Sequence, residues 1–339
     1  MSETRRNQSS DEQIEKSGYV QIVPRTTNLI VFGFQCLIDH RTSFISALTL
    51  LVIGLCAEIQ HQRVVIENSH GEKLVGVLHD TGSTETVVIC HGFRSSKNRI
   101  PMLTIASFFE RAMISSFRFD FAGNGESQGS FQYGNYRREV EDLRSVLQHL
   151  RGVNRVISAI IGHSKGGNVV LLYAAKYNDV QTVVNISGRF FLDRGIEFRL
   201  GKDYFKRIKD NGFIDVSNRK GKFEYRVTEE SLMDRLTTNA HEACLSIREN
   251  CRVLTVHGSN DRIVHVTEAS EFAKQIKNHK LYVIEGADHE FTSHQHQLAS
   301  IVLSFFKLDP KKDDESGSVF ESGCPKLLAD KRDHHRFGQ

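Results

Sequence analysis

The stretch VISAIIGHSKGGNVVLLYAAK, Val156 to Lys176, decides the fold. It begins as an apolar run typical of a buried strand and ends as an apolar, alanine-bearing run typical of a helix. Gly162, Ser164 and Gly166 stand between the two runs. A tight strand-to-helix turn crowds the residues that flank its corner, so those positions must lack a Cβ atom. The pattern predicts Ser164 at a strained corner, with its hydroxyl above the carboxyl edge of a sheet.

Two backbone N–H groups beside this corner are candidates for stabilising a negative charge. Lys165 would open the helix, and the first N–H groups of a helix lack an intrahelical partner and favour an anion. An earlier strand-like run, VVICHGF, ends in His91, Gly92 and Phe93. In a nucleophile-elbow arrangement the second donor comes from such a loop. We expect the N–H groups of Phe93 and Lys165 to form an oxyanion hole, with His91 bracing the loop rather than acting as a base.

A candidate acid and a candidate base follow the serine in the chain. Asp261 comes just after the strand-like run VLTVHG, and His289 comes just after LYVIEGAD. The order serine, acid, histidine is the one this arrangement requires. His289 would take the Ser164 proton and return it to the leaving group, while Asp261 would orient the imidazole and stabilise its charged form.

Two alternative assignments involve other acidic residues and histidines. Asp120, in FRFDFAGNGES, also ends a strand-like run, but it precedes the serine and is expected to organise its own loop. Asp288 and His289 could join His294 and His296 in a metal site. No HExxH motif accompanies them, so we interpret the two later histidines as solvated surface residues and expect neither a metal nor a cofactor.

Strand-like and helix-like runs alternate from Arg63 onward. After a predicted two-strand turn over 63–80, the predicted strands are 86–90, 114–119, 156–161, 182–187, 253–257 and 281–285. The predicted helices are 99–112, 137–152, 167–177, 267–277 and 296–307. This alternation predicts an α/β domain over 63–308, with a mostly parallel sheet covered by helices on both faces.

A long insertion, about 189–250, separates two of these strands. A simple crossover needs about a dozen residues, so the excess predicts a small, mostly helical cap over the mouth at Ser164. Part of it should line an apolar pocket through its aromatic residues: Phe190, Phe191, Phe198, Tyr204, Phe205, Phe213, Phe223 and Tyr225. Residues 189–226 carry 11 basic and 6 acidic side chains, which we interpret as a solvated outer face; steering of anionic esters is the alternative.

The two ends of the chain differ from this domain. Residues 1–62 form an N-terminal extension whose apolar segment, 28–57, includes a 14-residue run from Phe44 to Ala57. Because a bilayer span needs about 18 to 20 residues, we expect a packing helix or local extension, with membrane association or organelle targeting as alternatives. Residues 309–339 have the composition of a disordered tail.

Charge and cysteine usage exclude some classes of function. The net charge is +3, which gives no reason to expect nucleic acid as a partner. The six cysteines form no CxxC pair and indicate reduced thiols. We therefore expect a cytoplasmic location, with a membrane-associated or plastid location as alternatives.

From about Arg63 to Leu308 the chain resembles the α/β-hydrolase superfamily. It is most similar to the serine-aminopeptidase-type (S33) and acylglycerol-lipase or cinnamoyl-esterase-like branch, and to plant hydrolases of unassigned substrate. Besides the elbow, the His-Gly-Phe loop and the candidate acid and base, the loop pattern D-x-x-G-x-G-x-S supports the resemblance, at Asp120, Gly123, Gly125 and Ser127.

The resemblance implies a serine hydrolase without a cofactor. Its substrates would be small to medium-sized carboxylic esters or thioesters, cleaved through an acyl-enzyme on Ser164. A peptidase or acyltransferase with the same triad remains an alternative, and so does a ligand-binding or receptor module on the same scaffold, because one fold hosts many functions. The oligomeric state stays open.

Overall fold

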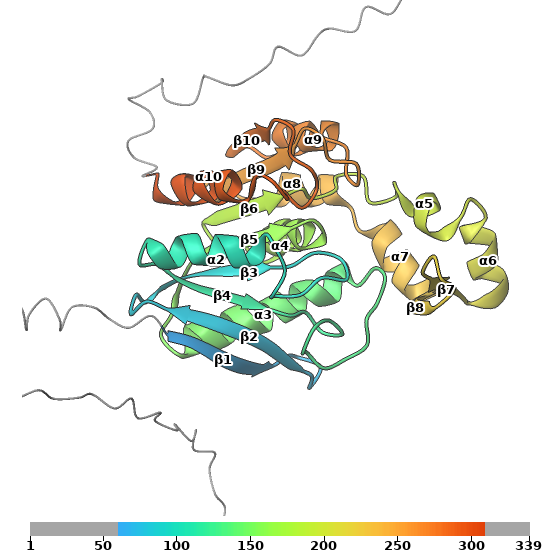
Figure 1. The fold of residues 1–339 in the computed structure, drawn as a ribbon, viewed down its shortest axis with the longest axis horizontal. Coiled ribbons are helices and arrows are strands. Elements are labelled where there is room, and N and C mark those ends of the chain that lie inside the picture. The colour runs from blue at the N-terminus through green and yellow to red at the C-terminus, as the bar shows by residue number, and fades with distance from the viewer. Residues whose placement is uncertain (1–59, 309–339) are drawn as a thin grey trace, which may run out of the picture. The chain divides into compact units, whose positions relative to one another are not determined.

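An eight-stranded sheet forms the centre of the protein in the computed structural model, which describes residues 60–308 (Figure 1). The order is β1-β2-β4-β3-β5-β6-β9-β10, with β2 antiparallel to β1 and β4 and the other neighbours parallel. The strands are β1 (Gln60–Glu67), β2 (Lys73–Asp80), β3 (Glu85–Cys90), β4 (Ser115–Phe119), β5 (Val156–His163), β6 (Thr182–Ile186), β9 (Arg252–Gly258) and β10 (His279–Ile284). The predicted mostly parallel sheet is confirmed; its first strand begins three residues before the predicted boundary at 63.

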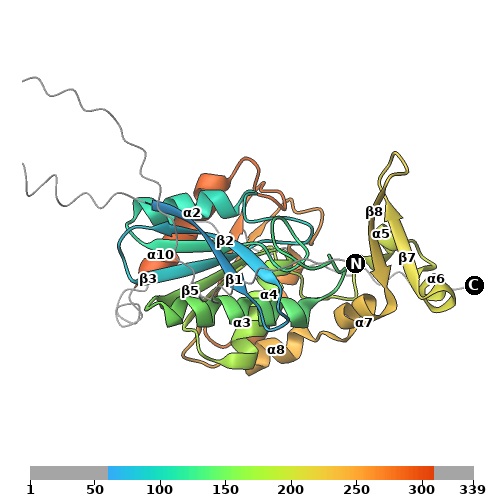
Figure 2. The ribbon, with the colours of Figure 1, turned by 90° about the horizontal axis from the view of Figure 1, so that it is seen from below.

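Helices cover both faces of the sheet (Figure 2). Helices α2 (Met102–Arg111) and α10 (Gln295–Lys307) pack on one face. Helices α3 (Tyr136–Gly152), α4 (Lys165–Tyr177) and α9 (Thr267–Gln275) pack on the other. Each helix turns an apolar stripe inward; in α3 the stripe consists of Val140, Leu143, Val146, Leu147 and Leu150.

The insertion forms a separate small layer at one end of the sheet (Figure 1). Its elements are α5 (Ile196–Leu200), α6 (Tyr204–Asn211), β7 (Phe213–Ser217), β8 (Phe223–Thr228), α7 (Glu229–Thr237) and α8 (Ala240–Ser246). The first five surround a core of Ile196, Leu200, Ile208, Ile214, Val227 and Leu232, whereas α8 packs back on α4. The prediction of a mostly helical insertion is confirmed, but it did not include the β7–β8 hairpin.

The hairpin has a local cause in the sequence. In β7 and β8, Ile214, Tyr225 and Val227 are buried between exposed neighbours, which is the period of a half-buried strand pair. The connecting turn bends at Gly221, with a φ of 75°, while the Asn218 side chain accepts two backbone N–H bonds within the turn.

Some predictions fall outside the described residues. The apolar segment 28–57 and the tail 309–339 are among them, and these predictions stay untested. Within residues 60–308, none of the helices has the length and apolar character needed to span a bilayer. Among the described cysteines, Cys90, Cys244 and Cys251 are free and buried.

Candidate active site

Ser164 occupies the corner between β5 and α4, with φ of 55° and ψ of −117°. A left-handed φ at a residue with a side chain is strained, and close packing around the corner maintains it. A Cβ atom on Gly166 would lie 2.5 Å from the carbonyl oxygen of His91 and 2.7 Å from that of Cys90. A Cβ atom on Gly162 would overlap the carbonyl of Gly166. The two flanking glycines thus meet the requirement inferred from the sequence.

A chain of hydrogen bonds joins the three residues proposed from their order in the sequence. The Ser164 hydroxyl lies 2.9 Å from Nε2 of His289, and Nδ1 of His289 lies 2.6 Å from Oδ2 of Asp261. Ser164 follows β5, Asp261 follows β9 and His289 follows β10, so all three come from the carboxyl edge of the sheet. In this arrangement the imidazole can accept the hydroxyl proton through Nε2 while Nδ1 donates to the carboxylate.

Asp261 is held as an ionised acceptor. Its other oxygen, Oδ1, accepts the backbone N–H groups of Ile263 at 2.8 Å and Val264 at 2.9 Å. Nε2 of His257 also lies 3.2 Å from Oδ2. Burial by itself raises the pKa of Asp261, but hydrogen bonds from His257, His289 and Val264 hold that pKa well below its usual range. The carboxylate is therefore fixed and charged where it meets His289.

Two buried neutral histidines support this arrangement. Nε2 of His163 bonds to the backbone oxygen of His289 at 2.9 Å, and burial lowers the pKa of His163 to about 3. Nε2 of His91 accepts the Phe121 N–H at 3.1 Å, so Nδ1 donates to the Gly92 oxygen at 2.8 Å. Burial lowers the pKa of His91 to about 4. With both ring nitrogens engaged, His91 braces its loop, as expected from the sequence.

A cavity of about 420 Å³ opens at Ser164. Phe93 and Lys165, the two predicted oxyanion donors, both line it. A Cβ atom on Gly92 would lie 3.0 Å from the Ser164 Cβ, which shows how closely the Phe93 loop approaches the serine. Of the insertion aromatics named above, Phe198 lines the cavity, whereas Phe190 packs against Phe272 in the core.

The Lys165 side chain forms a buried ion pair that the sequence did not reveal. Its Nζ lies 2.6 Å from Oε1 of Glu139, in the first turn of α3, and both side chains are almost fully buried. Burial raises the pKa of Glu139 to about 7, against the opposing effect of Lys165. The partners are 26 residues apart in the chain, and no motif links them. The pair ties the first residue of α4 to α3.

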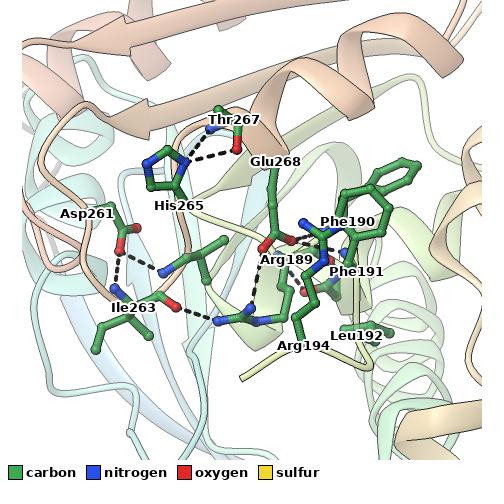
Figure 3. Close-up of polar contacts among 12 residues, drawn as sticks. Arg189, Phe190, Phe191, Leu192, Arg194, Asp261, Ile263, His265, Thr267 and Glu268 are labelled. Atoms are coloured by element: carbon green, nitrogen blue, oxygen red, sulfur yellow. Dashed lines mark hydrogen bonds and ion pairs between the residues drawn. The ribbon is translucent and has the colours of Figure 1, made fainter. Parts of the chain in front are cut away.

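A second unpredicted contact joins the start of the insertion to the loop that carries Asp261 (Figure 3). Oε2 of Glu268 accepts the backbone N–H groups of Phe190 at 2.8 Å and Phe191 at 3.0 Å. Its other oxygen lies 3.3 Å from Nη1 of Arg189, and the same guanidinium donates to the carbonyl of Ile263. The first residues of the insertion and the loop that carries Asp261 therefore belong to one hydrogen-bonded cluster.

Asp120 is not part of the hydrogen-bonded chain that includes His289. Its carboxylate instead organises the loop in which it lies. Its carboxylate accepts the backbone N–H and the ammonium group of Lys97, both at 2.6 Å, and the Glu126 N–H at 2.9 Å. Gly125, with a φ of 53°, leaves room for this carboxylate, because a Cβ there would overlap it. Asp120 thus has the loop-organising contacts expected of it.

Two groups of described residues could approach a metal ion. In one, His163 and Glu290 accompany His289, but both ring nitrogens of His289 are engaged. In the other, His61 and His79 both bond to Oε2 of Glu110 at 2.6 Å.

The second group is better explained as a hydrogen-bonded cluster. Nε of Arg118 donates to Nε2 of His79 at 3.0 Å, so the His79 proton is on Nδ1, where a metal would have to bind. Neither group contains Asp288, His294 or His296, the metal alternative raised by the sequence.

Comparisons with known proteins agree with this fold. Residues 82–213 match the family described as serine aminopeptidase, S33. An uncharacterized protein of Saccharomyces cerevisiae, YDL057W, is 26% identical over 227 residues, covering 60% of this chain and 68% of that protein.

Two solved structures have a similar fold. Est1E from Butyrivibrio proteoclasticus, solved with ferulic acid bound, has a TM-score of 0.63 at 22% identity, covering 71% of this chain and 97% of Est1E. The Pyrococcus furiosus esterase Pf2001 has a TM-score of 0.56 at 22% identity, covering 74% and 90%.

The structure therefore has the α/β-hydrolase fold. Residues 82–213 match the serine-aminopeptidase (S33) family, which confirms the resemblance to that branch drawn from the sequence.

The packing at the elbow predicts an asymmetry between two glycines. Gly166→Ala should destabilise the protein by several kcal/mol or prevent folding, because its Cβ would meet two fixed backbone carbonyls. Gly152→Ala, at the end of α3 with no atom within 4 Å of the new Cβ, should be neutral or slightly stabilising. Urea unfolding of both variants tests this. Equal stabilities would contradict the packing argument.

The ion pair predicts a non-additive double-mutant cycle. Lys165→Met should lower the free energy of unfolding by about 3 kcal/mol, because it leaves the buried Glu139 carboxyl without its cation. Adding Glu139→Gln should recover much of that loss, since no buried charge then remains. Urea unfolding at pH 8 gives the coupling energy. Additive effects of the two substitutions would show that the pair does not act as a unit.

Proposed function

We propose that this protein hydrolyses carboxylic esters or thioesters through an acyl-enzyme on Ser164. The observation that carries the proposal is the unbroken contact from the Ser164 hydroxyl through His289 to Asp261, at the wall of a 420 Å³ cavity. A cavity of this size fits a small or medium-sized acyl or aryl group. The proposed partner is accordingly a small-molecule ester, and no step requires a cofactor.

The first half of the reaction forms the acyl-enzyme. The Ser164 oxygen attacks the substrate carbonyl carbon while Nε2 of His289 takes the hydroxyl proton. The N–H groups of Phe93 and Lys165 stabilise the oxyanion that develops, and the Asp261 carboxylate stabilises the imidazolium. The bond between carbonyl carbon and leaving oxygen then breaks, and the imidazolium gives its proton to that oxygen, releasing an alcohol.

The second half reverses these roles with water. His289 removes a proton from a water molecule as it attacks the acyl carbon, and the bond to Ser164 then breaks. The proton returns to the serine oxygen, and the carboxylic acid leaves. Each cycle consumes one ester and one water and restores the enzyme.

The cavity chemistry favours an esterase over an aminopeptidase. An aminopeptidase must hold the positively charged N-terminus of its substrate, for which a carboxylate is the natural partner. Among the described residues, the cavity lining includes no aspartate or glutamate and five basic side chains, Lys165, Arg189, Arg199, Arg235 and Arg262. We therefore retain the ester hydrolase as the proposed activity. The buried free thiols support the cytoplasmic location proposed from the sequence.

Ser164→Ala should abolish both ester hydrolysis and labelling by a fluorophosphonate, because the nucleophile is lost while the corner still accepts a Cβ. The residual rate should be that left by the oxyanion hole alone, about 10³ to 10⁴ over water. Ser158→Ala, on the same strand, is the matched control and should keep both signals. Undiminished labelling of Ser164→Ala would place the nucleophile elsewhere.

Asp261→Asn should act mainly on kcat, reducing it by up to about 10⁴-fold, since an amide favours the wrong tautomer of His289. Asp120→Asn should instead reduce stability, because it weakens the ion pair with Lys97 inside a buried loop. Kinetics and thermal unfolding of both variants separate the two roles. The opposite pattern would overturn the choice of acid.

A further inference from the structure

The cavity at Ser164 is strongly basic, and its charge is only partly compensated. Two of its five cations pair with acidic residues that are not part of the cavity lining. Lys165 pairs with Glu139 at 2.6 Å, and Arg189 pairs with Glu268 at 3.3 Å. The other three, Arg199, Arg235 and Arg262, have no carboxylate within ion-pair distance among residues 60–308. The cavity thus carries an excess of positive charge at the place where substrate would bind.

Arg235, on α7, is the most unusual of the three because it is buried, with an exposure of 8%. Its guanidinium donates to the carbonyls of Leu192 and Arg194, both at 2.8 Å, and to the Tyr133 hydroxyl at 3.0 Å. All three acceptors are neutral. A buried cation without a counter-ion is unfavourable, so an anion entering the cavity would be stabilised by it.

The other two arginines approach the cavity from different elements. Arg199 extends from α5 of the insertion, and its guanidinium lies 4.8 Å from the centre of the Phe93 ring. Arg262 follows Asp261 directly in the loop after β9. Both are exposed to solvent. Three separate segments therefore direct positive charge at one cavity.

The rest of the lining limits what can bind there. Phe93, Phe198, Ile263 and Val264 contribute apolar surface to the same cavity. An ester with an apolar linker and a terminal anion would match both parts of this wall. An uncharged acyl chain would leave the arginines without a partner.

We propose that the substrate of this site is an acidic ester, which carries an anionic group such as a carboxylate within a few bonds of the scissile carbonyl. This inference rests on the proposed function, since it names the substrate class of the same site. Arg199, Arg235 and Arg262 hold the anion, and the scissile carbonyl lies at Ser164.

The test compares two esters of nearly equal shape. Mono-p-nitrophenyl glutarate ends in a carboxylate, and p-nitrophenyl 5-methylhexanoate ends in an isopropyl group of similar size. The wild-type enzyme should hydrolyse the acidic ester with the higher kcat/KM. The ratio of the two kcat/KM values should fall as salt rises from 20 mM to 500 mM, because salt screens the exposed arginines.

Variants assign the preference to residues. Arg199→Gln and Arg262→Gln should each lower the ratio by about tenfold, the size of one partly screened charge–charge contact. Arg199→Lys should restore part of it. Arg219→Gln, in the exposed turn between β7 and β8 and outside the cavity lining, is the matched control and should leave the ratio unchanged. Arg235→Met can be added if it folds, but the two exposed arginines suffice.

A second measurement does not depend on turnover. Monoethyl glutarate should slow fluorophosphonate labelling of Ser164 at concentrations at least tenfold below those of ethyl 5-methylhexanoate. If labelling occurs without such a difference, or if the kcat/KM ratio is the same in wild type, Arg199→Gln and Arg262→Gln, the acidic-ester inference is overturned while the serine hydrolase stands. If Ser164 is not labelled and neither ester is hydrolysed, the proposed function itself fails.

Discussion

The close approach of β5, α4 and the end of β3 at one corner is the constraint on which the site depends. At Gly162 and Gly166 the neighbouring backbone lies so close that no Cβ atom would fit. The same close packing keeps Ser164 at a φ of 55°. Strain at a nucleophile persists only where the surroundings fix it. Here the surroundings are buried parallel strands, so the serine position is determined by the core rather than by a mobile loop.

The contacts and burial around Asp261 and His289 set the protonation states of the site before a substrate binds. Hydrogen bonds from His257, His289 and Val264 keep Asp261 ionised, while burial keeps His163 and His91 neutral. In the proposed mechanism these neutral histidines matter, because a charged imidazole beside His289 would oppose the imidazolium that forms on His289. The ring centres of His163 and His289 are 5.1 Å apart, so this repulsion would be strong. The supporting histidines therefore contribute geometry without competing charge.

The site residues at the strand ends were predicted from the sequence, whereas the ion pairs around the cavity were not. Gly162, Ser164, Asp261 and His289 were found because they follow apolar runs at strand ends, where the spacing is local and visible. The Lys165–Glu139 and Arg189–Glu268 pairs were missed because each joins segments distant in the chain. The β7–β8 hairpin was missed although its alternating burial and its Asn218 to Gly221 turn are local signals.

The basic excess of the insertion shows why composition alone could not settle substrate choice. Residues 189–226 were interpreted as a solvated face, and many of their charges do pair at the surface, such as Arg226 with Asp215. Such exposed pairs are screened by solvent and say little about function. Arg199 differs only in its position, over Phe93 at the cavity. Arg235, which lies beyond this range on α7, differs by its burial. A charged side chain confers selectivity when it lies beside the reacting group and has no counter-ion. This property depends on three-dimensional placement rather than on the number of arginines.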